Sequence, residues 1–219
     1  MPTVNLSISA SADDCRSHRS SGCDPAQIEL TNAAGIVIDN DASCLDNNWI
    51  GGFRFLNALI DQGAIINSAT FTMHGDIQTG FGAQFVVYGN DIDDALPWAF
   101  VADEMPHDVE RTSASKPHTQ AFGSDVDIVV NVQSIIQEIV NRPGWASGND
   151  ISLIVEDDGP DFEFLVESID QAGSPTVATL DIDWEANPGE RNPGVARGSI
   201  GSDSIGKGSI ALPRSSVLT

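Results

Sequence analysis

The clearest pattern of apolar and polar positions predicts a helix over about residues 131–142. Apolar residues recur there at intervals of three and four, which places them on one face of a helix. They are Val132, Ile135, Ile136, Ile139 and Val140. The polar residues Gln133, Gln137, Glu138 and Asn141 are expected to face away from this stripe.

The residues after this helix predict its end and the start of a strand. Pro143 cannot continue a helix, and Gly144 is suited to the unusual backbone angles of a helix exit. Trp145 follows as a large apolar anchor. The alternation of Ile151, Leu153 and Val155 then predicts a strand.

Elsewhere the apolar positions mostly alternate with polar ones, which predicts strands. The predicted strands lie at 4–8, 27–30, 35–38, 49–56, 65–74, 83–88, 126–130, 151–155, 162–166 and 178–184. Loops are predicted through Pro25, over Asp39–Asn48 and over Asn90–Gly123. About ten short strands with one helix favour an all-β fold, a jelly-roll-like sandwich of two sheets.

The strand at 49–56 carries two specific predictions. Phe53 and Phe55 should point to one face and Arg54 to the other, because successive side chains alternate. The pair Gly51–Gly52 indicates a bulge or the close approach of another backbone. Phe53, Phe55, Trp145 and Trp184 are interpreted as structural residues of the core.

The hydrophobic pattern divides the chain into a sandwich domain, residues 1–186, and an extended arm, residues 187–219. Glycine, serine and proline dominate the arm, and isoleucine recurs every five residues, a period that fits neither helix nor strand. Such spacing predicts apolar anchors that dock onto a neighbour. The candidate docking residues are Arg191, Arg197, Ile200, Ile205, Lys207, Ile210 and Arg214.

Charge differs between the two parts. The whole chain carries −22, but four basic and two acidic residues give the arm +2, so the preceding body carries −24. A strongly acidic body argues against nucleic acid as a partner. The contrast favours docking of the arm onto an acidic surface, such as another copy of the chain.

Two further absences in the sequence bear on location. No run of about 20 apolar residues is present, so no membrane span is predicted. The N-terminal residues lack the basic and apolar regions of a secretory signal, and Met1 is present. We therefore expect synthesis in a host cytoplasm and later assembly, with the cell surface or extracellular space as the alternative.

Three cysteines occur, all in the first fifth of the chain: Cys15, Cys23 and Cys44. An odd number argues against a complete disulfide framework. Structural cysteines, either free or joined as a Cys15–Cys23 disulfide, are the main expectation. A zinc site of Cys15, His18, Cys23 and Cys44 is the alternative, although the spacing matches no common zinc pattern.

No motif for catalysis is evident, and the chain is predicted not to be an enzyme. His107 and Asp108 are interpreted as a solvated pair in the long loop, with ligand binding as the alternative. Trp98 lies in the same loop and is expected to be exposed, as a sugar platform or an interface anchor.

Acidic loops offer the residue types that bind calcium. The candidate ligands are Asp39, Asp41 and Asp46 in one loop and Asp91, Asp93 and Asp94 in another, with a third group at Asp157, Asp158 and Asp161. None of these has the spacing of a known calcium loop, so the main expectation is solvated turns and no cofactor.

Three segments together resemble the DNRLRE-type jelly rolls. They are GFRFLNALIDQGAIINSATFTM, VNVQSIIQEIVNRPGWASGNDISLIV and SPTVATLDIDW. The shared features fall on Phe53 and Phe55, Gly63 and Ala64, Ile66, Ser68 and Ala69, Trp145, and Gly148 and Asn149. This group includes a carbohydrate-binding module family (ninety-six) and surface proteins of microbes and phages. The resemblance covers about residues 4–184 and implies a jelly-roll fold.

These observations predict a non-enzymatic structural or adhesion module of a larger assembly. The leading hypothesis is a phage virion surface protein, such as a head decoration or tail component, held by its arm to copies of itself and to other structural proteins. A carbohydrate-binding module that recognises a surface glycan, aided by calcium, is the alternative. A polysaccharide-degrading enzyme is a third hypothesis.

Overall fold

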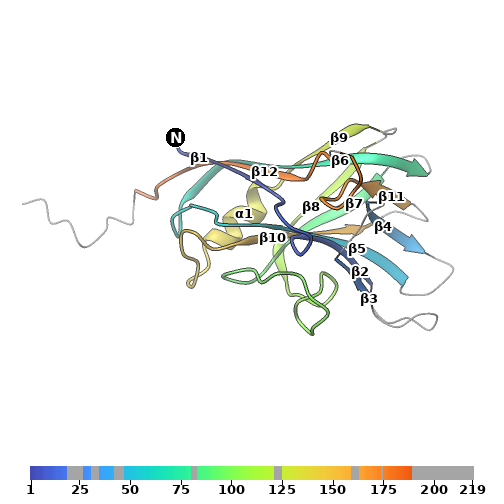
Figure 1. Cartoon of the computed structure of the whole chain (residues 1–219). Coiled ribbons are helices and arrows are strands. Elements are labelled where there is room, and N and C mark those ends of the chain that lie inside the picture. The colour runs from blue at the N-terminus through green and yellow to red at the C-terminus, as the bar shows by residue number, and fades with distance from the viewer. Residues whose placement is uncertain are drawn as a thin grey trace, which may run out of the picture.

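The computed structural model describes residues 1–18, 27–30, 35–41, 47–79, 83–120, 125–158, 163–173 and 175–188. Strands and one helix make up the regular structure of these residues, as predicted (Figure 1). The strands are β1 Thr3–Ser7, β2 Asp14–His18, β3 Gln27–Glu29, β4 Ile36–Asp41, β5 Asn47–Phe55, β6 Ile65–Thr79, β7 Ala83–Asn90, β8 Arg111–Gln120, β9 Val126–Asn131, β10 Ile151–Asp157, β11 Glu163–Val166 and β12 Thr179–Glu185. The helix α1 spans Gln133–Val140.

The strands form two antiparallel sheets that pack as a sandwich, which confirms the predicted all-β fold of two sheets. In sheet A, β6 pairs with β9 on one edge, and with β12 and then β11 along the other. β1 extends this sheet beyond β12, and β4 extends it beyond β11. Sheet B has the order β3-β2-β5-β10-β7-β8. β5 contributes to both sheets, because its first residues pair with β4 and its later residues with β2 and β10.

The core lies between the two sheets and is rich in phenylalanine. Phe53 of β5 lies 5.3 Å from Phe71 of β6, ring centre to ring centre, in an edge-to-face arrangement. Phe85 of β7 stacks on Phe164 of β11 at 5.2 Å. Each pair joins one sheet to the other. The four residues interpreted as structural from the sequence, Phe53, Phe55, Trp145 and Trp184, are all buried.

The helix closes one end of the sandwich, and its polar side chains form hydrogen bonds with backbone groups of the strands. The five residues of the predicted apolar stripe are all buried against β6, β7 and β8. Gln137 accepts a hydrogen bond from the Ile66 backbone N–H at 2.9 Å and donates one to the Ala64 carbonyl at 2.8 Å. The Glu138 carboxylate accepts the backbone N–H groups of Ser113 and Ala114, each at 2.7 Å. The helix therefore supplies partners for backbone groups at the ends of both sheets.

The helix ends before Pro143, but Gly144 does not have the role that the sequence indicated. The helix ends at Val140, two residues short of the predicted limit. Gly144 does not adopt a positive φ; instead, a Cβ there would lie 2.0 Å from Asp93 Oδ2. Gly144 thus leaves room for the Asp93 carboxylate. Trp145 is anchored as predicted, and its indole N–H donates to the Ile60 carbonyl at 2.9 Å.

Two strands were missed where the sequence predicted loops. β2 lies within the predicted loop before Pro25, and β8 lies within the predicted irregular region 90–123. β8 pairs only with β7 among the described strands. It can therefore accommodate Pro117, which has no backbone N–H to donate to a second neighbouring strand. The loop predicted over residues 39–48 was wrong at both ends, since residues 39–41 belong to β4 and residues 47–48 to β5.

We expect Gly89→Ala to destabilise the protein by roughly 1–3 kcal/mol, because it overpacks the contact between β7 and α1. A Cβ at Gly89 would lie 2.8 Å from side-chain atoms of both Ile135 and Ile139. Urea denaturation measures the change. Ser115→Ala, on the exposed side of the neighbouring β8, is the control and should stay within about 0.5 kcal/mol of the unaltered protein. Equal stability of the two variants would contradict the close helix–sheet contact.

Candidate functional site

The loop between β7 and β8, residues 91–110, covers the outer face of sheet B (Figure 1). Trp98 and Pro106 from this loop lie directly over Gly52 of β5. A Cβ at Gly52 would lie 2.5 Å from Pro106 Cγ and 2.8 Å from Trp98 Cε2. The glycine pair predicted a bulge or a close approach of another backbone. The register of β5 runs through it without a shift, and side chains make the close approach.

Trp98 is the centre of a second, smaller apolar cluster beneath this loop. The cluster contains Cys15, Ile50, Trp98, Val109 and Ile154. The expectation that Trp98 is exposed was wrong, because the side chain is 2% exposed. An indole in this position offers no free face on which a sugar ring could stack. Trp98 instead holds the loop against sheet B.

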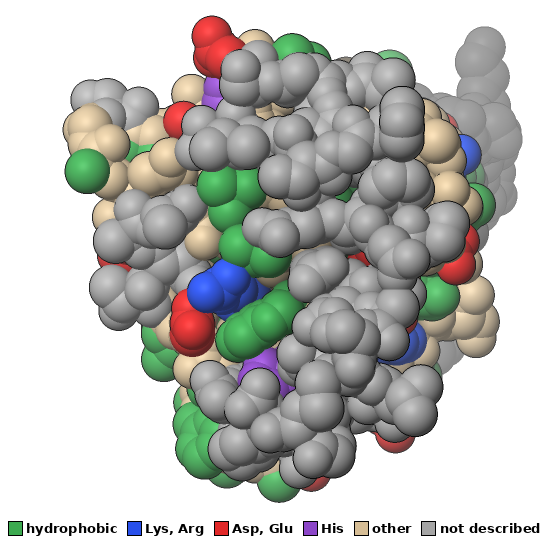
Figure 2. Space-filling view, turned by 90° about the vertical axis from the view of Figure 1, so that its right-hand side faces the viewer, with side chains coloured by type: hydrophobic (Ala, Val, Ile, Leu, Met, Phe, Trp, Pro, Cys, Tyr) green, Lys and Arg blue, Asp and Glu red, His purple; other side chains and the backbone are tan. Residues whose placement is uncertain are grey.

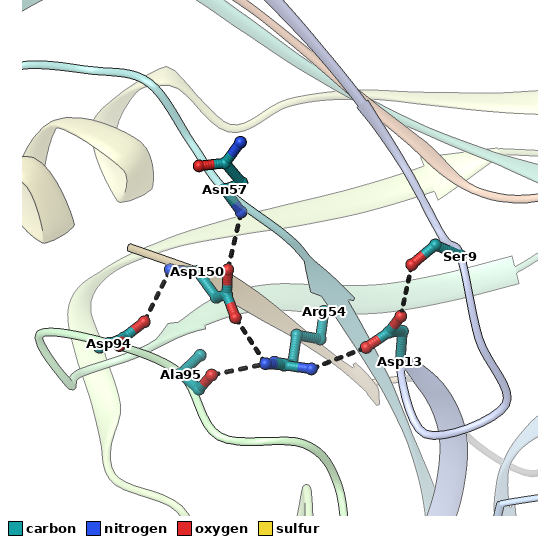
Figure 3. A network of polar contacts seen from close by, with 7 residues as sticks. All are labelled: Ser9, Asp13, Arg54, Asn57, Asp94, Ala95 and Asp150. Carbon is teal, nitrogen blue, oxygen red and sulfur yellow. Dashed lines mark hydrogen bonds and ion pairs between the residues drawn. The ribbon is translucent and has the colours of Figure 1, made fainter. Parts of the chain in front are cut away.

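Arg54 ties three segments together beneath the same loop (Figure 3). Its side chain points away from Phe53 and Phe55, as predicted, and donates to Asp13 Oδ1 at 2.8 Å and to Asp150 Oδ2 at 2.5 Å. The guanidinium also donates to the carbonyl of Ala95, in the loop, at 2.9 Å. Asp13 is almost fully buried, so Arg54 neutralises a charge that would otherwise be costly inside the protein.

The carboxylates bonded to Arg54 are themselves held by further groups (Figure 3). Ser9 donates its hydroxyl to Asp13 Oδ2 at 2.8 Å. The backbone N–H of Asn57 donates to Asp150 Oδ1 at 2.7 Å. Asp94 Oδ1 in turn accepts the backbone N–H of Asp150 at 2.8 Å. This network fixes the first part of the loop to the strands.

The second part of the loop is anchored by His107 and Arg111. His107 Nδ1 lies 2.9 Å from the Ser17 hydroxyl of β2, and its Nε2 lies 3.5 Å from Asp108. His107 is 1% exposed, so the prediction of a solvated His107–Asp108 pair was wrong for the histidine. Arg111 donates to the carbonyls of Val109 and Pro106 and pairs with Glu156 on β10. Both ends of the loop are therefore fastened to sheet B.

Between these anchors the loop presents an apolar tip to solvent, which we define as Leu96, Phe100 and Val101. The three side chains are 53%, 65% and 54% exposed. A tight turn sets the tip, since the Glu104 N–H donates to the Val101 carbonyl and the Ala99 N–H to the Glu104 carbonyl. Asp103 occupies the left-handed region at φ 65° within this turn. A firmly anchored loop with exposed apolar side chains is suited to contact with another molecule.

The acidic groups proposed for calcium are used mainly in ion pairs and turns. Asp91 and Asp93 both pair with Arg142, the latter at 2.8 Å, and Asp94 accepts the Asp150 N–H. Asp39 and Asp41 lie on β4, not in a loop, and Asp46 and Asp161 fall outside the described residues. Within the described ranges, no group of three or more metal-binding side chains comes together. Calcium binding stays a prediction.

Other predicted residues divide between the described and undescribed parts. Cys15 is a buried free thiol on β2, and burial raises its pKa well above the usual value. Because Cys15 is free in this structure, the Cys15–Cys23 disulfide is contradicted. Cys23 and Cys44 lie outside the described residues, so the zinc alternative stays untested. The seven candidate docking residues of the arm also lie outside them: Arg191, Arg197, Ile200, Ile205, Lys207, Ile210 and Arg214.

Asp14, beside Cys15, is a buried carboxylate that sequence reasoning missed. Its Oδ2 accepts the backbone N–H of Ile169 at 2.8 Å, while Oδ1 is buried without a hydrogen-bond partner. Burial, together with the nearby charges of Asp170 and Asp13, raises the pKa of Asp14 to about 7. A run of two aspartates in a polar stretch gave no signal of burial.

A second missed arrangement lies at the end of the sandwich opposite α1, where basic, acidic, hydrophobic and histidine side chains gather (Figure 2). Arg16 lies over the ring of Trp49 at 4.4 Å and pairs with Glu29 at 2.7 Å. The ring of His18 meets Trp49 edge-on at 4.5 Å. The three segments are far apart in sequence and come together only because β2 pairs with both β3 and β5.

Comparison with known proteins identifies no family: no protein-family model matches the chain, and no curated protein matches it. The resemblance to DNRLRE-type jelly rolls therefore stays a prediction. Within the described part of the chain, no helix is long and apolar enough to cross a membrane.

Proposed function

We propose that this protein is a non-catalytic structural module of a larger assembly and, specifically, a surface protein of a phage virion. The observation that carries the proposal is the apolar tip, which an anchored loop holds out into solvent. Large exposed apolar side chains grouped on a braced loop are characteristic of surfaces that contact another protein. The resemblance to jelly rolls of phage surface proteins is the reason for naming a virion.

The polar residues near the tip support this proposal because they act as internal braces. Arg54 joins Asp13, Asp150 and the Ala95 carbonyl, and His107 contacts Ser17 beneath the loop. Trp98, on which the sugar-binding alternative depended, is buried against Gly52. The most elaborate contacts in this region therefore serve to position the loop.

The distribution of charge supports contact between copies. The body carries −24 and the arm +2, so an arm is attracted to the surface of a neighbouring body. The isoleucines of the arm would add apolar contact to this attraction. Other structural proteins of the particle are the second class of partner in this proposal.

Deletion of residues 187–219 is expected to abolish incorporation into the particle while leaving the sandwich folded. Particle composition by mass spectrometry and the oligomeric state by analytical ultracentrifugation measure the loss, and circular dichroism checks the fold. A variant with Ile200, Ile205 and Ile210 changed to serine is the matched control for chain length and charge, and it should also fail to assemble. Normal assembly of the deletion variant would overturn the proposal.

A further inference from the structure

The apolar tip lies in the most acidic loop of the described surface. Residues 91–110 contain seven carboxylates and no lysine or arginine. Two of these carboxylates, Asp91 and Asp93, are paired with Arg142. Asp103 and Glu104 lie in the turn that carries Phe100 and Val101, and neither has a salt-bridge partner among the described residues.

A partner for this surface must combine apolar side chains with positive charge. Apolar side chains would cover Phe100 and Val101, and positive charge would complement Asp103 and Glu104. Within this chain, residues 189–219 have both properties, since Arg197, Lys207 and Arg214 are interspersed among Ile200, Ile205 and Ile210. The spacing places a basic residue within three or four positions of each isoleucine.

The position of the tip relative to the end of β12 favours contact with a second copy. β12, the last strand before this segment in the sequence, belongs to sheet A, whereas the loop covers the outer face of sheet B (Figure 1). Residues 189–219 could span up to about 100 Å if fully extended, so length does not limit reach to a neighbour. A donor segment on one side and its receptor on the other give a head-to-tail contact, which repeats into rings or lattices.

We propose that the apolar tip, with Asp103 and Glu104, is the receptor for residues 189–219 of a neighbouring copy. This inference rests on the proposed function and gives it a specific contact. Phe100 and Val101 take the isoleucine side chains, and the two carboxylates take the basic residues. The contact weakens with salt because part of its attraction is between exposed charges.

Photo-crosslinking of the full-length protein tests this contact directly. A benzoylphenylalanine introduced at Ile205 is activated in a mixture of unlabelled and ¹⁵N-labelled chains, and the joined peptides are identified by mass spectrometry. We expect crosslinks to residues 91–104 that combine labelled with unlabelled peptides. Crosslinks confined to a single chain, or directed to another segment or another face, would overturn the inference.

Substitution of the receptor provides the second arm of the test. Phe100→Ser with Val101→Ser in the full chain should remove the crosslink and weaken self-association about tenfold or more. Val129→Ser is the matched control, because Val129 is 52% exposed but lies on β9 in sheet A. The control should associate normally, and both variants should keep the melting temperature of the unaltered protein.

The two proposals fail in different ways. If deletion of residues 187–219 prevents assembly but the Phe100/Val101 variant assembles normally, the receptor is wrong and the proposed function stands. If the deletion variant itself assembles normally, the proposed function is wrong, and this inference fails with it.

Discussion

Replacement of Arg54 by methionine is expected to lower the free energy of unfolding by about 3–5 kcal/mol. The guanidinium is only 12% exposed and binds Asp13, which is 2% exposed, together with Asp150 and the Ala95 carbonyl. Methionine fills a similar volume but leaves the Asp13 carboxylate buried with only the Ser9 hydroxyl as a partner. Urea denaturation followed by circular dichroism measures the loss.

The matched control is Arg16→Met, which removes a more exposed ion pair with Glu29 together with the contact of the guanidinium with the Trp49 ring. Surface pairs of this kind contribute about 0–1 kcal/mol, so the control should change stability little. Asp13→Asn in the Arg54→Met background should recover part of the stability, because it removes the unpaired charge. A loss below about 1 kcal/mol for Arg54→Met would show that the network does not brace the fold.

The Arg54 variant also connects stability with the proposed contact surface. Loss of the bond to the Ala95 carbonyl removes the anchor just before Leu96, while Trp98 and Pro106 still pack on Gly52. The loop should then open more often and become sensitive to protease between residues 96 and 104. Self-association should weaken in parallel, because the apolar tip is no longer held in one position.

Asp14→Asn is expected to stabilise the protein at pH 8 by roughly 2–4 kcal/mol and to have little effect near pH 4. The pKa of Asp14 is about 7 in the folded protein, against an ordinary value of 3.8. The folded state therefore holds a proton that the unfolded state releases between about pH 4 and pH 7. The contribution of protonated Asp14 to the free energy of unfolding is fully present below about pH 4. This contribution is lost as the pH rises from about 4 to 7.

Asparagine removes this pH dependence because it stays neutral and still accepts the Ile169 N–H. Its amide group would replace Oδ1, which is buried without a partner and lies near the negative charges of Asp170 and Asp13. Melting temperatures at intervals between pH 4 and pH 8 measure the effect. Asp103→Asn, on the exposed loop turn, is the control and should leave the pH profile unchanged. A variant profile that still falls between pH 4 and pH 7 would contradict the role assigned to Asp14.

Asp14 on β2 and Arg54 on β5 are close together on paired strands, yet their substitutions are expected to change the free energy of unfolding in opposite directions. Asp13 is buried with a cation in contact, whereas Asp14 is buried near the negative charges of Asp170 and Asp13 and has no cation as a partner among the described residues. Removing the cation leaves a buried charge uncompensated, and removing the Asp14 charge relieves repulsion and desolvation. Comparison of the two variants therefore separates the effect of pairing a buried carboxylate with a cation from the effect of burying a carboxylate without one.

The sequence by itself determined the elements whose side chains follow a simple period. The helical stripe from Val132 to Val140 and the alternation around Phe53 and Phe55 are local patterns, and each reports which face meets the core. From these elements the two-sheet sandwich could be predicted, because several short strands with one helix have few other ways to bury their apolar faces.

The sequence failed where burial does not follow the apolar pattern. β2 is a strand of polar residues, DCRSH, yet four of its five side chains are buried. Cys15 and Ser17 lie under the 91–110 loop, whereas Asp14 contacts the Ile169 backbone and His18 packs against Trp49. β8 pairs only with β7 among the described strands, and one of its ten residues is buried, so it has no buried face for an apolar alternation to mark. Both depend on pairing with distant strands, which no local pattern records.

The candidate site was decided by tertiary structure for the same reason. Gly52 is small because Trp98 and Pro106, about 50 residues later, pack on it, and this contact also buries the indole. Arg54 finds its partners 41 and 96 residues away. The sequence predicted one long loop over residues 90–123. Only the fold distinguishes the residues that anchor this loop from Leu96, Phe100 and Val101, which it leaves exposed.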